Sequence, residues 1–153
     1  MNSLHYQKNK LFFDQLDLEE LSKVITTPFY LYSENLIKQN IKEYISQSND
    51  KTLFCYSVKA NSNLSILKLI ASQGMGFDVV SMGELYRVIK AGCDTKKVVY
   101  SGVGKTRAEI RYALENNILC FNVESEGELF VINDEASAMG TTANISIRVN
   151  PDV

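Results

Sequence analysis

The sequence is poor in the residues that build metal centres and disulfide frameworks. Its 153 residues include a single histidine, His5, so this stretch holds no histidine-based metal site and no histidine-containing catalytic triad. The three cysteines, Cys55, Cys93 and Cys120, are odd in number, far apart and without a Cys-x-x-Cys motif. We therefore expect reduced cysteines with a structural role.

Charge of one sign and long apolar runs are lacking as well. The formal net charge is only -2, which gives no electrostatic reason to expect nucleic acid or an anionic membrane as partner. No apolar run approaches the roughly 20 residues of a membrane-spanning helix, and residues 1–10 lack the apolar centre of a signal peptide. We expect a globular cytoplasmic protein that binds neither nucleic acid nor membrane.

What the sequence does contain is a lysine at the end of an apolar run. Residues 53–58, Leu-Phe-Cys-Tyr-Ser-Val, predict a buried strand, and Lys59 follows them just before small and polar residues that could begin a helix. A cation there must be solvated, paired or used chemically, because a buried unpaired charge is costly. Lys59 is therefore either a strand-end lysine that reaches solvent or an amine nucleophile.

From residue 53 onward the chain repeats a strand followed by a helix. Three of the helices begin with the capping-box pattern Ser/Thr-x-x-Glu, at Ser81, Thr106 and Ser125. Apolar strands joined by helices indicate a parallel sheet covered on both faces. The predicted strands are residues 53–58, 77–80, 98–100, 118–123 and 145–149, and the predicted helices are residues 63–72, 81–91, 106–115 and 125–139.

The first 32 residues have a different pattern. Residues 1–27 are predicted to be a lead-in with a helix at 17–24, and residues 28–32 a short aromatic strand. Ser33 is expected to cap the next helix. The apolar residues on one face of that helix are Leu36, Ile37, Ile41, Tyr44 and Ile45.

Two topologies satisfy the repeated pattern, a doubly wound open sheet and a (β/α)8 barrel. In both, functional groups gather at the carboxyl ends of the strands. A barrel needs about 250 residues, and this sequence ends at residues 150–153 directly after a predicted strand. A barrel would therefore make the chain a fragment.

Two further features of the sequence bear on function. Gly102-Val-Gly-Lys-Thr106 resembles the end of a phosphate-binding Walker loop, but Val99 occupies the position of the required first glycine, so the match fails. Asp78 and Arg148 are charged residues inside otherwise apolar strands. They form either a structural ion pair in the barrel interior or part of a site for an anion or cofactor.

Five segments together resemble a known family. They are Tyr56-Ser-Val-Lys-Ala-Asn-Ser-Asn63, Phe77-Asp-Val-Val-Ser81 followed by Gly83-Glu-Leu85, Ser101-Gly-Val-Gly-Lys-Thr106, Phe121-Asn-Val-Glu-Ser-Glu126 and Ser146-Ile-Arg-Val-Asn-Pro-Asp152. In order and spacing they resemble the diaminopimelate decarboxylase family, which belongs to the fold-type III pyridoxal-phosphate-dependent decarboxylases.

The resemblance implies a fold and site residues. Residues 33–153 would be the N-terminal part of a pyridoxal-phosphate-binding (β/α)8 TIM-type barrel, with its first five strands, and residues 1–32 a lead-in and a strand of the second, β-rich domain. Lys59 matches the lysine that holds pyridoxal 5'-phosphate as a Schiff base. Asp78 and Arg148 match a charged pair near the cofactor.

The resemblance also implies a reaction, the decarboxylation of meso-2,6-diaminopimelate to L-lysine by a cytoplasmic homodimer. The alternatives are another fold-type III decarboxylase, acting on ornithine, arginine or carboxynorspermidine, or a non-catalytic truncated remnant. The remaining cofactor and substrate residues of the family come later than residue 153. We therefore expect residues 1–153 alone to be inactive.

Overall fold

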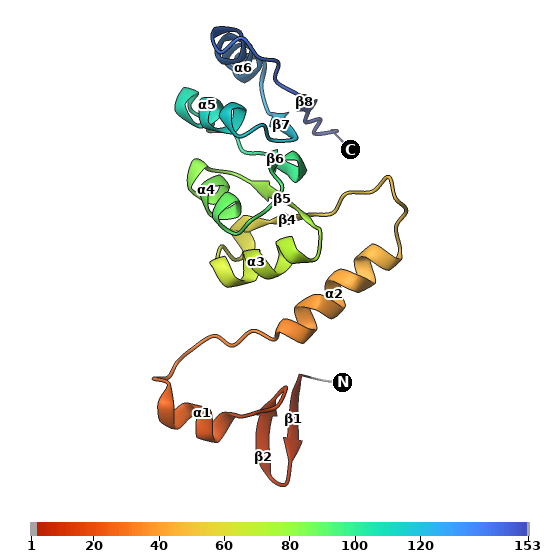
Figure 1. The fold of residues 1–153 in the computed structure, drawn as a ribbon, viewed down its shortest axis with the longest axis vertical. Coiled ribbons are helices and arrows are strands. Elements are labelled where there is room, and N and C mark those ends of the chain that lie inside the picture. The colour runs from red at the N-terminus through yellow and green to blue at the C-terminus, as the bar shows by residue number, and fades with distance from the viewer. Residues whose placement is uncertain (1–2, 153) are drawn as a thin grey trace. The chain divides into compact units, whose positions relative to one another are not determined.

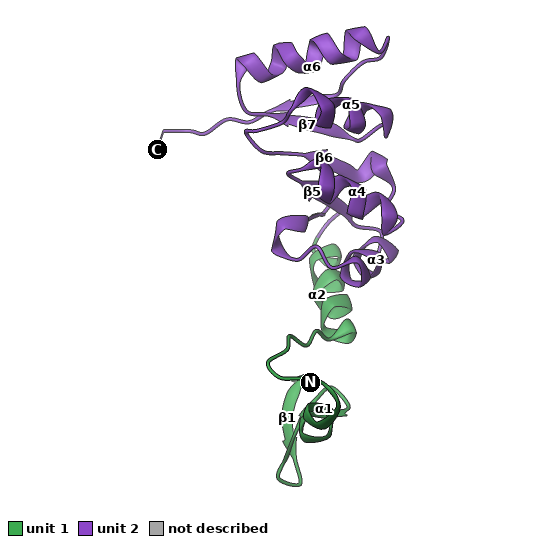
Figure 2. Cartoon of the chain, turned by 90° about the vertical axis from the view of Figure 1, so that its left-hand side faces the viewer, with its two compact units in different colours: residues 1–47 green, residues 48–153 purple. Residues whose placement is uncertain are grey.

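The computed structural model describes residues 3–152 (Figure 1). Contacts divide the chain into two compact units, residues 1–47 and residues 48–153, which Figure 2 shows in separate colours. The second unit contains all the residues that the sequence marks as candidates for a site.

The second unit is built on a parallel sheet of five strands. These are β4 (Cys55–Ser57), β5 (Gly76–Val79), β6 (Val98–Tyr100), β7 (Cys120–Val123) and β8 (Ile145–Ile147). The strand order is β4-β5-β6-β7-β8, and every neighbouring pair is parallel. A doubly wound sheet reverses its order at a switch point. The unbroken order is instead that of successive strands in a (β/α)8 barrel, which confirms the predicted fold class.

Helices follow the strands as the capping signals predict. They are α3 (Leu64–Ser72), α4 (Met82–Lys90), α5 (Arg107–Glu115) and α6 (Glu126–Ala138), with short 3-10 turns η1 (Val58–Ala60) and η2 (Thr95–Lys97). Figure 1 shows α4, α5 and α6 along the same side of the strands. Among the described residues, no helix has the length and apolar character needed to cross a membrane.

The two faces of this sheet differ. Residues that point toward the helices are fully or almost fully buried, as at Phe77, Tyr100 and Phe121. Burying each such side chain contributes about 1.5–3 kcal/mol. Residues that alternate with them, such as Asp78 and Asn122, are only partly buried, because no described helix covers that face. Helices lie on only one face of the sheet within residues 3–152, as in a (β/α)8 barrel, and we call the other side the inner face.

The three predicted capping boxes differ in detail. Each cap hydroxyl accepts a hydrogen bond from the backbone N–H of its glutamate, in α4, α5 and α6 alike. Only Thr106 and Glu109 form the reciprocal box. The carboxylates of Glu84 and Glu128 instead accept from the residue before the cap, Val80 N–H at 2.8 Å and Glu124 N–H at 2.7 Å. These two carboxylates therefore fix the strand ends as well as the helices.

The first unit contains a small antiparallel sheet that the sequence patterns did not predict. Its strands are β1 (Leu4–Gln7), β2 (Lys10–Phe13) and β3 (Leu16–Asp17). The turn between β1 and β2 consists of Lys8 and Asn9, both at positive φ. Lysine is not a residue that signals such a turn, so the hairpin carries no Asn-Gly-type marker.

Two helices complete the first unit. Asp17 caps α1 (Leu18–Val24), which confirms the helix predicted at 17–24. Ser33 caps α2 (Glu34–Ser46) by accepting from Leu36 N–H, as predicted. The strand predicted at 28–32 is wrong, because this segment is irregular in the structure. A strand is held by hydrogen bonds to a neighbour, and no segment within residues 3–152 pairs with it.

Candidate cofactor site

Lys59 lies where the apolar run predicts, at the carboxyl end of the first strand of the parallel sheet. It occupies the middle of η1, immediately after β4, and it is exposed. Its neighbour Val58 is fully buried and anchors the turn. No described carboxylate lies within ion-pair distance of Lys59 in residues 3–152. Its amine is thus free of an internal charge partner.

A row of polar side chains crosses the inner face beside β4. Asp78 on β5 accepts a hydrogen bond from Ser101 Oγ at 2.5 Å. Asn122 on β7 donates from its side-chain amide to the same Ser101 oxygen at 2.8 Å. We call Asp78, Ser101 and Asn122 the polar row. Because each member touches the next, the row gives the Asp78 carboxylate a fixed orientation.

Ser57 extends this polar surface toward Lys59. It is the last residue of β4 and lies opposite Asp78 in the strand register. Its Oγ is buried and has no hydrogen-bond partner among the described residues 3–152. Buried hydroxyls normally have a partner, so this oxygen suits a polar group bound at the inner face.

Asp78 and Arg148 do not pair, so the first of the two alternatives, a structural ion pair between them, is wrong. They belong to β5 and to the end of β8, which are separated by β6 and β7, a distance of about 14 Å across the sheet. Arg148 instead contacts Glu124, with Nη1 at 3.0 Å from Oε2. The register explains this choice, because Val123 lies opposite Ile147 and the next residues on each strand therefore face each other.

Glu124 is held from several sides. Its Oε1 accepts a hydrogen bond from Gly102 N–H at 2.9 Å, and its side chain is 7% exposed. The Gly102 N–H, followed by the nearby charges of Arg148 and Lys105, holds the pKa of Glu124 below its usual range. Glu124 is therefore an ionised carboxylate that joins the ends of β6, β7 and β8.

Lys105 is a second lysine at the carboxyl ends of the strands, and its environment is the opposite of that of Lys59. Its side chain is 1% exposed. Its Nζ donates to Gly102 O at 2.8 Å, Asn122 O at 2.9 Å and Glu128 Oε1 at 2.5 Å. We call Lys105, Glu128, Glu124 and Arg148 the charged cluster. In the sequence analysis Lys105 occurs only within the Gly102–Thr106 segment that fails to match a Walker loop. No sequence pattern predicted that it is buried.

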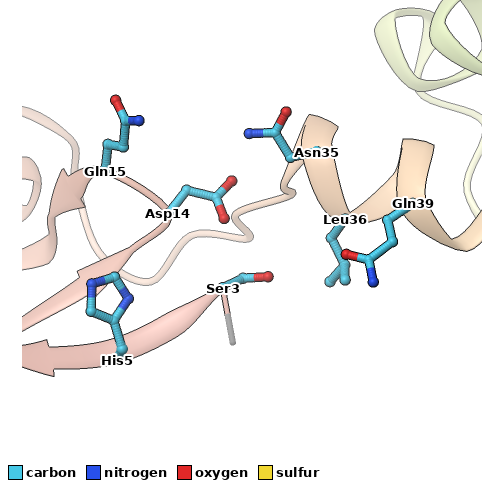
Figure 3. Close-up of a pocket in the computed structure, with 7 residues that line it drawn as sticks. All are labelled: Ser3, His5, Asp14, Gln15, Asn35, Leu36 and Gln39. Carbon is cyan, nitrogen blue, oxygen red and sulfur yellow. The ribbon is translucent and has the colours of Figure 1, made fainter. Parts of the chain in front are cut away.

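Two cavities can be compared with these residues by their position. One of about 270 Å³ lies at the carboxyl ends of β7 and β8 and is lined by Val123, Glu124, Ser125, Glu126, Leu129, Ile147 and Arg148. Another of about 490 Å³ lies in the first unit and is lined by Ser3, His5, Asp14, Gln15, Asn35, Leu36 and Gln39 (Figure 3). Neither cavity is lined by a lysine; the first adjoins Glu124 and Arg148 at the strand ends, whereas the second lies in the other unit.

The cysteines are free thiols, as predicted. Burial raises the pKa of Cys55 and of Cys120, and it raises the pKa of Cys93 to about 11. Within residues 3–152, no group of three or more histidine, cysteine or acidic side chains could hold a metal ion. The residues suited to chemistry are thus the amine of Lys59 and the polar row.

This arrangement defines a class of protein. A βα sheet in barrel order, with an unpaired lysine at the carboxyl end of its first strand, is a barrel domain that can hold a carbonyl compound through an amine.

Comparison with known proteins names the family. Residues 34–153 match the family model described as "Pyridoxal-dependent decarboxylase, pyridoxal binding domain", and the chain belongs to this family. It is 47% identical, over 150 residues, to the diaminopimelate decarboxylase of Aquifex aeolicus, a match that covers 98% of this chain and 36% of that protein. The chain thus spans a little over a third of the length of the curated relatives it matches.

Solved structures agree with this assignment. The diaminopimelate decarboxylase of Helicobacter pylori, complexed with L-lysine, superposes with a TM-score of 0.87 at 48% identity, covering 90% of this chain and 35% of that one. The enzyme of M. jannaschii, also in complex with L-lysine, superposes with a TM-score of 0.94 at 39% identity, covering 100% of this chain and 38% of that one. The predicted resemblance and fold are therefore confirmed.

The described residues fit the cofactor of this family, pyridoxal phosphate. Its aldehyde requires a lysine amine with no competing partner, and Lys59 satisfies this while Lys105 does not. The buried and unpartnered Ser57 Oγ and the oriented polar row offer hydrogen-bonding groups on the inner face next to β4.

Proposed function

We propose that the protein containing this chain removes one carboxylate from meso-2,6-diaminopimelate and produces L-lysine, with pyridoxal phosphate as cofactor. The observation that carries this proposal is the unpaired Lys59 at the end of β4, in a chain that belongs to the pyridoxal-binding domain family. The identity of 47% to a diaminopimelate decarboxylase over almost the whole chain supports the substrate.

The residues of this chain have distinct tasks in that reaction. Lys59 supplies the amine to which the cofactor aldehyde is attached and, once released by the substrate amine, can hold a proton near the reacting carbon. Asp78, fixed by Ser101, places a carboxylate beside the cofactor. Arg148, fixed by Glu124, presents the rest of its guanidinium at the mouth of the site. Pyridoxal phosphate, when bound, accepts the electrons left behind by carbon dioxide.

Further properties of the whole protein are also proposals. It works in the cytoplasm as a homodimer, and residues 1–32 belong with a second, β-rich domain. Its ligand is a small amino acid, which is supported by the two structurally similar enzymes that were crystallised with L-lysine. Nucleic acid is not a partner, since the net charge is only -2.

A substrate comparison tests the proposal. The protein containing this chain, loaded with pyridoxal phosphate, is assayed for carbon dioxide release from meso-diaminopimelate, ornithine, arginine and carboxynorspermidine. We expect turnover of meso-diaminopimelate and L-lysine as product. Faster turnover of one of the other amino acids would reassign the substrate. Bound cofactor without any turnover would support a non-catalytic role.

A further inference from the structure

Lys105 occupies the centre of a hydrogen-bond network at the carboxyl ends of β6 and β7. An ammonium has three N–H donors, and the three acceptors around Lys105 Nζ are Gly102 O, Asn122 O and Glu128 Oε1, at 2.5–2.9 Å. The ammonium also lies 5.9 Å from the centre of the Tyr100 ring. With every donor used, Lys105 has none left for a ligand. Any role of Lys105 in the site must therefore act through the residues that it contacts.

One branch of the network leads from Lys105 to the polar row. Lys105 holds the backbone carbonyl of Asn122, and the side chain of the same residue donates to Ser101 Oγ at 2.8 Å. Ser101 in turn donates to Asp78 at 2.5 Å. A shift of the end of β7 would therefore move the Asn122 amide and release the orientation of Asp78.

The other branch leads to Arg148. Glu128 uses one oxygen for Lys105 and the other for Glu124 N–H, at 2.5 Å and 2.7 Å. Glu124 then holds Gly102 N–H and the Arg148 guanidinium. Lys105 thus holds the loop after β6 by the carbonyl of Gly102, while Glu124 holds it by the N–H of the same residue.

The charges of the cluster balance, which allows three of its members to be buried, while Arg148 is 54% exposed. Lys105 and Arg148 offset Glu128 and Glu124, whose side chains are 9% and 7% exposed. Removing one member of a buried charged group leaves its partner uncompensated, whereas removing a pair together avoids that cost. A variant that lacks both Lys105 and Glu128 therefore avoids an unpaired buried charge, and its cofactor binding can be measured apart from a loss of stability.

We propose that Lys105 is a positioning residue for the cofactor site, which sets the orientation of Asp78 and Arg148 through Asn122 and Glu124 without touching the cofactor. This inference rests on the proposed function, because it needs pyridoxal phosphate to bind at Lys59. It assigns the two lysines at this end of the sheet different tasks, covalent attachment for Lys59 and orientation for Lys105.

The test uses the double variant Lys105→Met/Glu128→Met in the protein containing this chain, since it removes the buried pair as a unit. Lys68→Met is the control for loss of a lysine charge alone, because Lys68 is exposed on α3. Measurements are the thermal midpoint, the affinity of the apoprotein for pyridoxal phosphate, the visible circular dichroism of the bound cofactor, and peptide mapping after borohydride reduction.

The double variant should fold and still carry the cofactor on Lys59, but with affinity weakened by about tenfold, equivalent to the loss of one charge-assisted hydrogen bond. Its visible circular dichroism should shrink because the cofactor is less rigidly oriented, and kcat should fall more than KM rises. Lys68→Met should match the parent protein in each respect.

Unchanged affinity and dichroism in a folded double variant would overturn the proposal. A double variant that cannot fold would overturn it too, because Lys105 would then serve the fold rather than the site. A parent protein that binds no pyridoxal phosphate would instead refute the proposed function, which keeps the two failures distinguishable.

Discussion

At the scale of single residues, Lys59 and Lys105 show how position decides the task of a lysine. Both follow strands of one sheet, yet Lys59 is exposed and unpaired within residues 3–152, and Lys105 has three internal acceptors. A lysine whose nitrogen is buried and already bonded to three acceptors is not available to attack a carbonyl group. The cofactor should therefore attach to Lys59 alone.

Replacing Lys59 by alanine tests this directly. We expect no covalent label after borohydride reduction and no detectable turnover, with a stability change within about 0.5 kcal/mol because the side chain is on the surface. Lys68→Ala is the control and should keep the label and activity. A label that persists in Lys59→Ala, on Lys105 or another lysine, would contradict the assignment.

The charged side chains give a second prediction. Double-mutant cycles with Asp78→Asn, Glu124→Gln and Arg148→Met should show coupling between Glu124 and Arg148, which touch. Asp78 and Arg148 should be additive within about 0.3–0.5 kcal/mol, because two strands separate them.

Acid should abolish the coupling between Glu124 and Arg148. The folded-state pKa of Glu124 is lowered by Gly102 N–H and by Arg148, so this stabilisation is present above the unfolded-state pKa. It is lost as the pH falls through the lower folded-state value. Strong coupling between Asp78 and Arg148 at neutral pH would instead show that the observed pairing is incorrect.

The thiols allow a third prediction. Burial, followed by the charge of Asp94, raises the pKa of Cys93 to about 11, and the thiolate is the reactive form. Cys93 should therefore react slowly with iodoacetamide at pH 8 in the folded protein and faster after unfolding in urea. Mass spectrometry of the alkylated peptides measures both rates. Equal rates in the two states would mean that burial does not protect the thiol.

At the scale of helices and strands, Glu109 is the most heavily used cap. Its carboxylate accepts from Thr106 N–H and Oγ1, from Met82 N–H and from the Tyr100 hydroxyl, at 2.8–3.0 Å. It therefore ties the starts of α4 and α5 to β6. Burial opposes ionisation, but these hydrogen bonds outweigh it and lower the pKa of Glu109.

Glu109→Gln should destabilise the protein by about 1–3 kcal/mol, because hydrogen bonds to a charged acceptor are replaced by weaker ones. Glu126→Gln, in the exposed first turn of α6, is the control and should be nearly neutral. Denaturant unfolding gives both values. The difference should shrink as the pH falls through the lowered pKa of Glu109, since the carboxylate of the parent protein is then protonated.

The sequence predicted the elements of the second unit well because their signals are local. Apolar runs located β4 to β8, and the caps Ser81, Thr106 and Ser125 located three helix starts within one residue. The hairpin of the first unit was missed because its turn, Lys8-Asn9, lacks the Asn-Gly or Asp-Gly pair that marks such turns. Glu135 was missed because its burial depends on Arg107 and Arg111 of the preceding helix, which hold its carboxylate.

The candidate residues of the site were visible in the sequence only where their signal was also local. Lys59 and Asp78 stand out as charges at or within apolar strands, a feature visible in one segment. The partners of Arg148 and Lys105 depend on strand register, which no single segment specifies. Sequence patterns therefore singled out these charged residues, and the ion pair considered between Asp78 and Arg148 was wrong.

At the scale of the whole polypeptide, five strands in barrel order leave an unpaired edge. β8 is the last strand of the sheet, and among residues 3–152 no strand pairs with its outer side. Ile145, Ile147 and Val149 in this segment are 41%, 67% and 76% exposed. An exposed apolar strand edge promotes association between chains.

A polypeptide of residues 1–153 alone should therefore self-associate and show no turnover of meso-diaminopimelate. Ile147→Lys should reduce the association, because a lysine on an edge strand opposes edge-to-edge pairing. Val103→Lys is the matched control, since Val103 is 88% exposed in a loop and adds the same charge away from the edge. Sedimentation velocity measures the oligomer distribution of all three. A monodisperse parent polypeptide with measurable turnover would contradict the prediction, and equal effects of the two lysines would show that net charge, rather than the β8 edge, controls the association.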